Sequence, residues 1–257
     1  MRVHEEEDLL GFATTDFKEV TQNRARLAPY LALWKGVQEV DSSLQSWQRG
    51  NIFSLDADTV SGDVERLYRT GDRLGRALRK PAPMAADVAD QLAGKVDKFR
   101  TNLALLHVMC NPGMRDRHWE AVSDVVRVRI RPTGGWDLQR LLDLGLDEFL
   151  PALQIVSDAA TREHSIEKAL DQMEAEWVAM TLGLKQHSET GVSVMQGEHA
   201  DALQTTITDH TVRTQTMRGS PHAAPVQERL TRHADFLAKG RRVLSQWLEV
   251  QKAWVHY

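Results

Sequence analysis

Residues 27–50 read LAPYLALWKGVQEVDSSLQSWQRG, and their apolar side chains recur at intervals of three and four residues. This spacing gathers the apolar side chains on one face of a helix. Pro29 fits the first turn of that helix, where its missing N–H costs little. Gly50 and Asn51 then end the helix. The stretch therefore predicts a long amphipathic helix that needs apolar partners, and this favours a helical bundle.

Two more helices are predicted directly downstream. The first begins near Ala57 and ends before Pro81 and Pro83, because a residue that precedes proline disfavours helical geometry. The second runs from about Met84 to Cys110. Three long helices joined by short breaks predict an antiparallel bundle.

The second half of the chain has a less regular pattern. A short helix is expected over residues 117–125, an irregular connection over 127–136, and helical segments over 138–142 and 149–160. Ser165 is a plausible N-cap for a further helix that reaches Trp177, because its hydroxyl can accept from a free backbone N–H.

Near the end of that helix the apolar period changes from helical spacing to strict alternation. Residues 178–184 and 192–194 alternate on either side of a turn that contains Gly191, which predicts a β-hairpin near 178–195. A last helix is expected over 224–257, and its uncapped end has the character of a truncation.

The predicted fold class is mainly α: an elongated array of antiparallel helix bundles with one small β-hairpin. The expected organisation has three parts. Residues 1–26 form an N-terminal helical extension and residues 27–110 form a first helical bundle. Residues 111–257 form a second helical subdomain, which carries the hairpin and is truncated at its C-terminus.

Composition excludes several classes of protein. Of 257 residues, 42% are hydrophobic and 26% are charged, which supports a folded chain with a core. The net charge of −4 argues against a nucleic-acid binder, whose surface should be basic. Cys110 is the sole cysteine, so no intramolecular disulfide can form. No run approaches the roughly 18 apolar residues of a membrane span, and a soluble intracellular protein is expected.

Motifs for catalysis or metal binding are not found. A phosphate-binding loop needs Gly-x-x-x-x-Gly-Lys-Ser/Thr, and no stretch of the sequence has this form. No His-Glu-x-x-His is present, and Cys110 is better explained as a small core residue than as a nucleophile. The chain is therefore predicted to be no enzyme and to carry no cofactor or metal.

Two further features have a structural interpretation. A basic run could contact an acidic partner or tubulin, but a solvated helix face is the simpler reading; it comprises Arg66, Arg69, Arg73, Arg76, Arg79 and Lys80. The seven tryptophans are predicted to stiffen the core, because each one buries a large apolar area when packed.

Four strings of sequence, in order, resemble one protein family. Residues 111–120 read NPGMRDRHWE, residues 165–170 read SIEKAL, residues 214–221 read TQTMRGSP, and residues 247–254 read WLEVQKAW. Together they resemble the linker region of dynein heavy chains, over roughly Leu27 to Tyr257, and the first and third look more axonemal than cytoplasmic. The family-signature residues are expected to be structural; they are Asn111, Pro112, Gly113, Arg117, His118, Trp119, Thr214, Gln215, Met217, Arg218 and Gly219.

The resemblance implies a mechanical lever. In complete motors of this family the linker lies across a ring of AAA modules and switches between bent and straight arrangements as nucleotide changes. ATP and Mg²⁺ would act in those modules, which this chain lacks. Residues 127–136 and 214–225 are candidate joints between stiff helical blocks.

The implied setting is minus-end-directed, microtubule-based movement in the axoneme of a cilium or flagellum. The implied partners are the AAA ring and tail of the heavy chain, with dynein intermediate and light intermediate chains as further candidates. Microtubules would be met only indirectly, and neither nucleic acid nor membrane is expected. The alternative function is a stand-alone helical protein-interaction scaffold derived from a motor gene. A bundle enzyme with a metal or small-molecule pocket is a third reading, against which the missing ligand motifs count.

Overall fold

The computed structural model describes residues 6, 8–12, 18–133, 135–188 and 191–256. The chain divides into two compact units. The first comprises residues 1–110 and 123–153, and the second comprises residues 111–122 and 154–257. Parts of the predicted N-terminal extension, residues 1–5, 7 and 13–17, lie outside the described residues. Residues 18–26 belong to a long helix.

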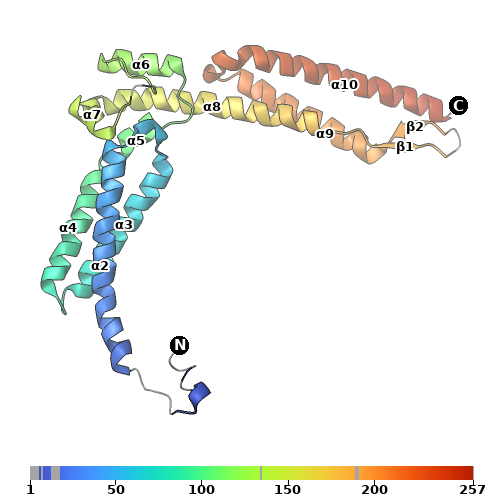
Figure 1. Ribbon diagram of the computed structural model, residues 1–257. Coiled ribbons are helices and arrows are strands. Elements are labelled where there is room, and N and C mark those ends of the chain that lie inside the picture. The colour runs from blue at the N-terminus through green and yellow to red at the C-terminus, as the bar shows by residue number, and fades with distance from the viewer. Residues whose placement is uncertain (1–5, 7, 13–17, 134, 189–190, 257) are drawn as a thin grey trace. The chain divides into compact units, whose positions relative to one another are not determined.

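The first unit is built on a bundle of three long helices. These are α2 (Lys18–Arg49), α3 (Ala57–Leu78) and α4 (Pro83–Arg100), which lie side by side (Figure 1). Pro29 lies inside α2 rather than in its first turn, because the helix begins at Lys18. The bundle core contains Leu33, Leu74, Leu78, Ala86 and Ala89.

The predicted helix from Met84 to Cys110 is two helices. The first, α4, ends at Arg100, and α5 (Leu103–Met109) follows it. At the break the N–H of Asn102 donates to the Phe99 carbonyl at 2.9 Å, and the Asn102 carbonyl accepts the first bond of α5 from Leu106 at 3.0 Å. A tight turn thus separates two segments whose apolar spacing looks continuous in sequence.

Short elements complete the first unit. They are η1 (Ile52–Ser54), the last residues of α6 (Asp116–Val126), α7 (Leu138–Asp143), η2 (Leu146–Phe149) and the first residues of α8 (Leu150–Ala179). The Ile52 N–H donates to the Trp136 carbonyl at 2.9 Å, which joins the start of the bundle to the irregular stretch before α7.

Arginines of the basic run pair with carboxylates of their own bundle at four positions, namely 66, 69, 76 and 79. Arg69 and Arg76 pair with acids one turn earlier on α3, and Arg79 pairs with Asp90 of α4. Arg66 contacts both Asp63 and Glu39. Because the four arginine side chains remain more than half exposed, each pair contributes at most about 1 kcal/mol.

The second unit contains most of α8 together with α9 (Gly197–Arg218), η3 (Pro221–Val226) and α10 (Gln227–His256). The α8 helix is continuous, so the prediction that Ser165 caps a new helix is wrong. Ser165 lies in mid-helix, where its hydroxyl donates to the Thr161 carbonyl at 2.8 Å. In an uninterrupted helix the N–H groups that a cap would satisfy are already bonded.

A two-stranded antiparallel hairpin connects α8 to α9. Strands β1 (Leu184–Gln186) and β2 (Ser193–Met195) pair with Leu184 opposite Met195 and Gln186 opposite Ser193. The predicted strand start at Val178 is wrong, because α8 extends to Ala179. The mainly helical fold with one small hairpin is confirmed.

The tryptophans differ in burial, so their prediction as core residues is only partly correct. Trp47, Trp119 and Trp136 are buried. In contrast, Trp34, Trp247 and Trp254 keep between 40% and 69% of their surface exposed. Helical spacing identifies the face on which a side chain lies, but whether another element covers that face depends on the tertiary fold.

No helix in the described part of the chain is long and apolar enough to cross a membrane.

Candidate functional site

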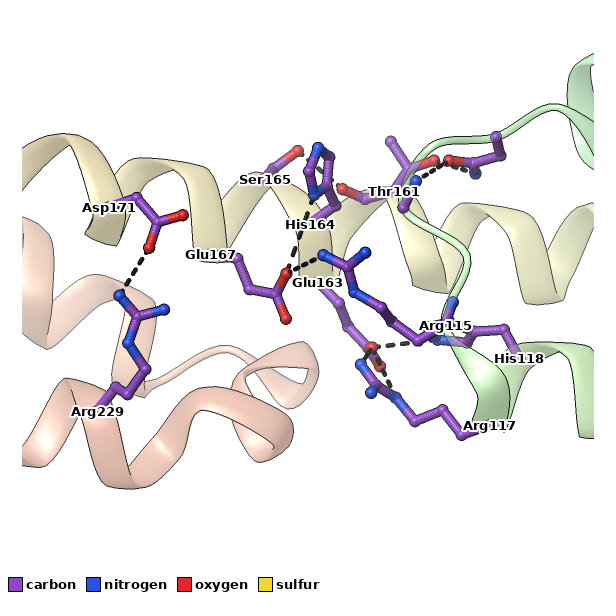
Figure 2. Close-up of polar contacts among 12 residues, drawn as sticks. Arg115, Arg117, His118, Thr161, Glu163, His164, Ser165, Glu167, Asp171 and Arg229 are labelled. Atoms are coloured by element: carbon purple, nitrogen blue, oxygen red, sulfur yellow. Dashed lines mark hydrogen bonds and ion pairs between the residues drawn. The ribbon is translucent and has the colours of Figure 1, made fainter. Parts of the chain in front are cut away.

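One face of α8 carries a row of carboxylates, which we call the acidic stripe: Glu163, Glu167, Asp171 and Glu174. Their spacing of three and four residues aligns them along a single side of the helix. Carboxylates this close repel one another unless cations lie between or beside them. Arginines from two parts of the second unit supply those cations: Arg115 and Arg117 from residues 111–122, and Arg229 from the C-terminal part (Figure 2).

The turn that begins at Asn111 is fastened to α8 by the asparagine amide. Asn111 Nδ2 donates to the Ser157 carbonyl at 2.9 Å, and it lies 2.7 Å from Ser157 Oγ and 2.8 Å from Thr161 Oγ1. Asn111 Oδ1 accepts from the Gly113 N–H at 2.8 Å and closes the turn. One side chain therefore both shapes the turn and anchors it to the helix.

Gly113 lies directly against the backbone of α8. A Cβ at position 113 would lie 2.6 Å from the Ala160 carbonyl oxygen and 3.0 Å from His164 Cβ. Only glycine fits against a helix backbone at that distance. Pro112 beside it is exposed.

Two arginines that follow the turn meet the acidic stripe. Arg115 donates to Glu167 Oε2 at 2.7 Å, and Arg117 Nε donates to Glu163 Oε2 at 3.1 Å. The Arg117 Nη2 atom contacts the same oxygen. The Glu163 and Glu167 side chains are only 15% and 20% exposed, so these pairs are better shielded from water than those of the first unit.

His118 completes the contact with Glu163. Its Nδ1 accepts from the Arg115 backbone N–H at 3.0 Å, so the ring proton is on Nε2, 3.1 Å from Glu163 Oε2. Burial lowers the pKa of His118, and this outweighs the opposing effect of Glu163. The neutral imidazole therefore donates one hydrogen bond and accepts another. Trp119, the next residue, is buried.

The other family-signature residues, Thr214 to Gly219, lie at the end of α9. Thr214 is fully buried, and its hydroxyl donates to the His210 carbonyl at 2.6 Å. Met217 packs against a cluster formed by α8, η3 and α10 that includes Leu170 and Met173. The Gly219 N–H caps the helix by donating to the Gln215 carbonyl. The Gln215 and Arg218 side chains are exposed.

The two signature segments thus do not converge on one pocket. The first is anchored on α8 between Ser157 and Glu167, and the second packs through Met217 on the cluster around Leu170. Both use α8 as their common support. The family model described as "Dynein heavy chain, N-terminal region 2" matches residues 20–257. The chain belongs to this dynein heavy-chain family.

Several curated relatives of the chain are axonemal dynein heavy chains. The chain is 30% identical to human "Dynein axonemal heavy chain 3" over 99% of its own length and 6% of that protein. It is 27% identical to rat "Dynein axonemal heavy chain 1" over 100% and 6% of the two lengths, and 26% identical to human "Dynein axonemal heavy chain 12" over 99% and 8%. This dynein segment therefore spans less than a tenth of the length of these relatives.

Sequence reasoning missed the residues of this dynein segment that receive the signature arginines. Glu163 and Glu167 were identifiable as a pair one helical turn apart, but their partners lie about 50 positions away. It also missed Arg229 of α10, which bonds Asp171 and Glu174 at 2.6 Å each. These bonds raise the pKa of the Arg229 guanidinium. All four carboxylates of the acidic stripe thus contact arginine.

The remaining candidates for chemistry in the segment are a metal site and the sole cysteine. Among the described residues, no group of three or more His, Cys, Asp or Glu side chains is arranged to hold a metal ion. The Cys110 thiol donates to the Ile52 carbonyl at 3.1 Å, and burial raises its pKa to about 12. The acidic stripe therefore has a structural role: its ion pairs with arginine attach α6 and α10 to α8.

Proposed function

We propose that this chain is a linker-type lever of an axonemal dynein heavy chain, which transmits movement produced elsewhere in the motor and has no active site of its own. The observation that carries the proposal is the double fastening of α8. The signature arginines hold its middle at Glu163 and Glu167, and Arg229 holds it further along at Asp171 and Glu174.

The physical requirement for a lever is resistance to bending. A helix of 30 residues is about 45 Å long at 1.5 Å per residue, and alone in water it would fray and bend. Side chains that clamp it at successive turns raise its stiffness, because bending would break several charged hydrogen bonds together. Gly113 contributes by allowing the turn to lie directly against the helix backbone.

A lever that changes shape also needs joints. Residues 127–136 and 219–226 are the candidates, since the first stretch has no regular helix where the structure describes it and the second leaves α9 through a turn and η3. Residues 214–218 of the earlier candidate joint are helical and belong to α9 instead.

Hydrogen exchange on the purified chain tests the assignment of joints. Amides in the two candidate joints should exchange at least about tenfold faster than those of α8 between residues 157 and 171, because they lack a helical hydrogen-bond ladder held by tertiary contacts. Equal protection of amides in the candidate joints and in α8 would contradict the assignment of the joints. The proposal that arginines stiffen α8 would not be affected.

The same proposal assigns chemistry to other parts of the motor. ATP hydrolysis with Mg²⁺ would occur in AAA modules, and the partners would be the AAA ring and the tail, with intermediate and light intermediate chains as further candidates. The site of action would be the axoneme. An ATPase assay of the purified chain with Mg²⁺ should give no turnover above a buffer control, and turnover that co-purifies with the chain would refute the lever role as stated.

A further inference from the structure

A groove is lined by the C-terminal half of α10 and by the hairpin. These two elements lie next to each other in Figure 1. The groove has a volume of about 570 Å³, and its lining includes Val194 from β2 and Val243, Trp247, Val250 and Trp254 from α10. The four α10 residues recur at intervals of four, three and four, so they form one stripe along the helix. Each keeps between 40% and 67% of its surface exposed.

An apolar stripe of this kind differs from scattered surface residues. Isolated exposed apolar side chains are ordinary on proteins, but a continuous hollow with two tryptophans marks a place where another surface packs. The stripe from Val243 to Trp254 is about 17 Å long at 1.5 Å per residue, which matches three turns of a second helix.

The edge of β2 argues against an added strand. Gln251 Oε1 accepts from the Met195 N–H at 2.8 Å, and Gln251 Nε2 donates to the Met195 carbonyl at 2.9 Å. The Trp247 indole N–H donates to the same Gln251 oxygen at 3.1 Å and holds the amide in place. An incoming strand would find only Ser193 on this edge of β2, whereas a helix satisfies its own backbone groups.

Charged side chains of α10 beside the groove indicate which kind of helix could bind there. Lys239 precedes Val243 by one turn, and Arg242 lies on the same flank as Gln246. The exposed carboxylate of Glu249 lies on that flank too, so two cations stand beside one anion. Both cations are exposed, and neither has an ion-pair partner within the described ranges of the chain. The two cations at the Lys239 end of the stripe therefore favour carboxylates on a helix laid over it.

We propose that this groove binds an amphipathic helix of a partner polypeptide, with apolar residues packed on Trp247, Val250 and Trp254 and carboxylates opposite Lys239 and Arg242. The binding mode is a helix laid into an apolar groove, in which buried aromatic residues supply affinity and flanking charge sets orientation. The inference does not depend on the lever role.

The test uses the full chain and a fluorescein-labelled, alanine-rich helical peptide of about 15 residues, enough to cover the stripe. The peptide has leucine every three or four residues and glutamate along one flank of that face. Fluorescence anisotropy should give saturable binding that weakens with added salt. A matched peptide with lysine in place of glutamate should bind at least about tenfold more weakly.

Variants of the chain locate the site. Val250→Asp should weaken binding at least about tenfold, whereas Val212→Asp, at an exposed position of α9, should not. The double variant Lys239→Glu, Arg242→Glu should reverse the preference and select the lysine peptide. Arg241→Glu is its control, because residue 241 lies on the opposite side of α10 from Val243. Unchanged circular dichroism establishes that each variant is folded.

Three kinds of result would overturn the proposal. The first is peptide binding that does not depend on the charge or on the groove: equal affinity for both peptides, or binding that Val250→Asp leaves intact. The second is a dimer in sedimentation experiments that Val250→Asp disperses, which would assign the groove to a second copy. The third is binding to phosphatidylserine vesicles that requires Val250 and Trp254 and competes with the peptide, which would assign the stripe to a lipid surface.

Discussion

Gly113 and Ala160 approach so closely that position 113 has no room for a side chain. A Cβ there would lie 2.6 Å from the Ala160 carbonyl oxygen and 3.0 Å from its carbonyl carbon, and both atoms belong to the α8 backbone. A helix backbone cannot move aside as the end of a flexible side chain can. The contact therefore fixes how near the Asn111 turn lies to α8.

Gly113→Ala should destabilise the second unit by about 1–3 kcal/mol, the usual range for forcing a methyl group into a packed site. Urea unfolding followed by circular dichroism measures the change. Gly94→Ala is the matched control, because a Cβ at position 94 of α4 meets nothing within 4 Å. That change should be neutral or stabilise by up to about 1 kcal/mol. Equal effects of the two substitutions would refute the close-contact argument.

Glu163 links two donors from the signature segment, Arg117 and His118. Glu163→Gln should cost about 1–3 kcal/mol, because it removes the charge from three hydrogen bonds in a shielded position, two from Arg117 and one from His118. Arg117→Met alone should cost at most about 1 kcal/mol, since the arginine side chain is 44% exposed.

A double-mutant cycle separates the pair from its surroundings. The coupling between Glu163→Gln and Arg117→Met should be about 0.5–1 kcal/mol and should shrink in 1 M salt. Glu228→Gln with Arg232→Met is the control pair, because these exposed residues of α10 are 3.9 Å apart. If the coupling free energy of the Glu163–Arg117 pair were no larger than that of the control pair, the Glu163–Arg117 pair would not hold α6 against α8.

The elements that sequence predicted best are those whose apolar face is long and uninterrupted. The α3 helix begins at Ala57 as its spacing predicts, and it ends at Leu78, before the proline pair. The predictions were wrong where one local sequence signal is compatible with two structures. Ser165 has the residue type of a helix cap, but the decisive fact is whether free N–H groups follow it, and in α8 they do not.

The start of the hairpin was misplaced for a related reason. Residues 178–184 alternate in polarity, but α8 continues to Ala179. The last turn of α8 contacts α9, and a contact between residues so far apart in the chain has no local sequence pattern. Trp177 Nε1 donates to His210 Nδ1 on α9 at 3.0 Å. Likewise, the arginine partners of the acidic stripe were unpredictable, since Arg229 lies 58 residues from Asp171.

His233 provides a prediction about pH. The side chain is 5% exposed, and its Nε2 has no hydrogen-bond partner among the residues that the structure describes. Burial lowers its pKa most, the nearby His210 and Arg229 lower it further, and Glu174 opposes them. The unfolded histidine, with a pKa near 6.5, therefore takes up a proton at a higher pH than the folded one.

Stability should consequently be complete above about pH 6.5 and should fall as the pH drops from there toward the lower folded pKa. His233→Phe should leave stability at pH 8 unchanged or raised, and should flatten the slope between pH 7 and pH 5. Urea unfolding at several pH values measures both. The His118 contribution has the same sign and persists in the variant, so the informative quantity is the difference in slope. An identical slope in both proteins would contradict the assignment to His233.

Cys110 should be almost unreactive in the folded chain. Its thiol donates to the Ile52 carbonyl, and burial, together with the nearby Asp56 carboxylate, raises its pKa to about 12. Because the thiolate is the reactive form, very little of it exists at pH 8. Reaction with a chromogenic disulfide reagent should be at least about a hundredfold slower in native buffer than in 6 M guanidinium chloride, where the thiol pKa returns to about 8.5. Rapid labelling of the native chain, with circular dichroism unchanged, would mean that the thiol is open to solvent and that its bond to Ile52 does not persist.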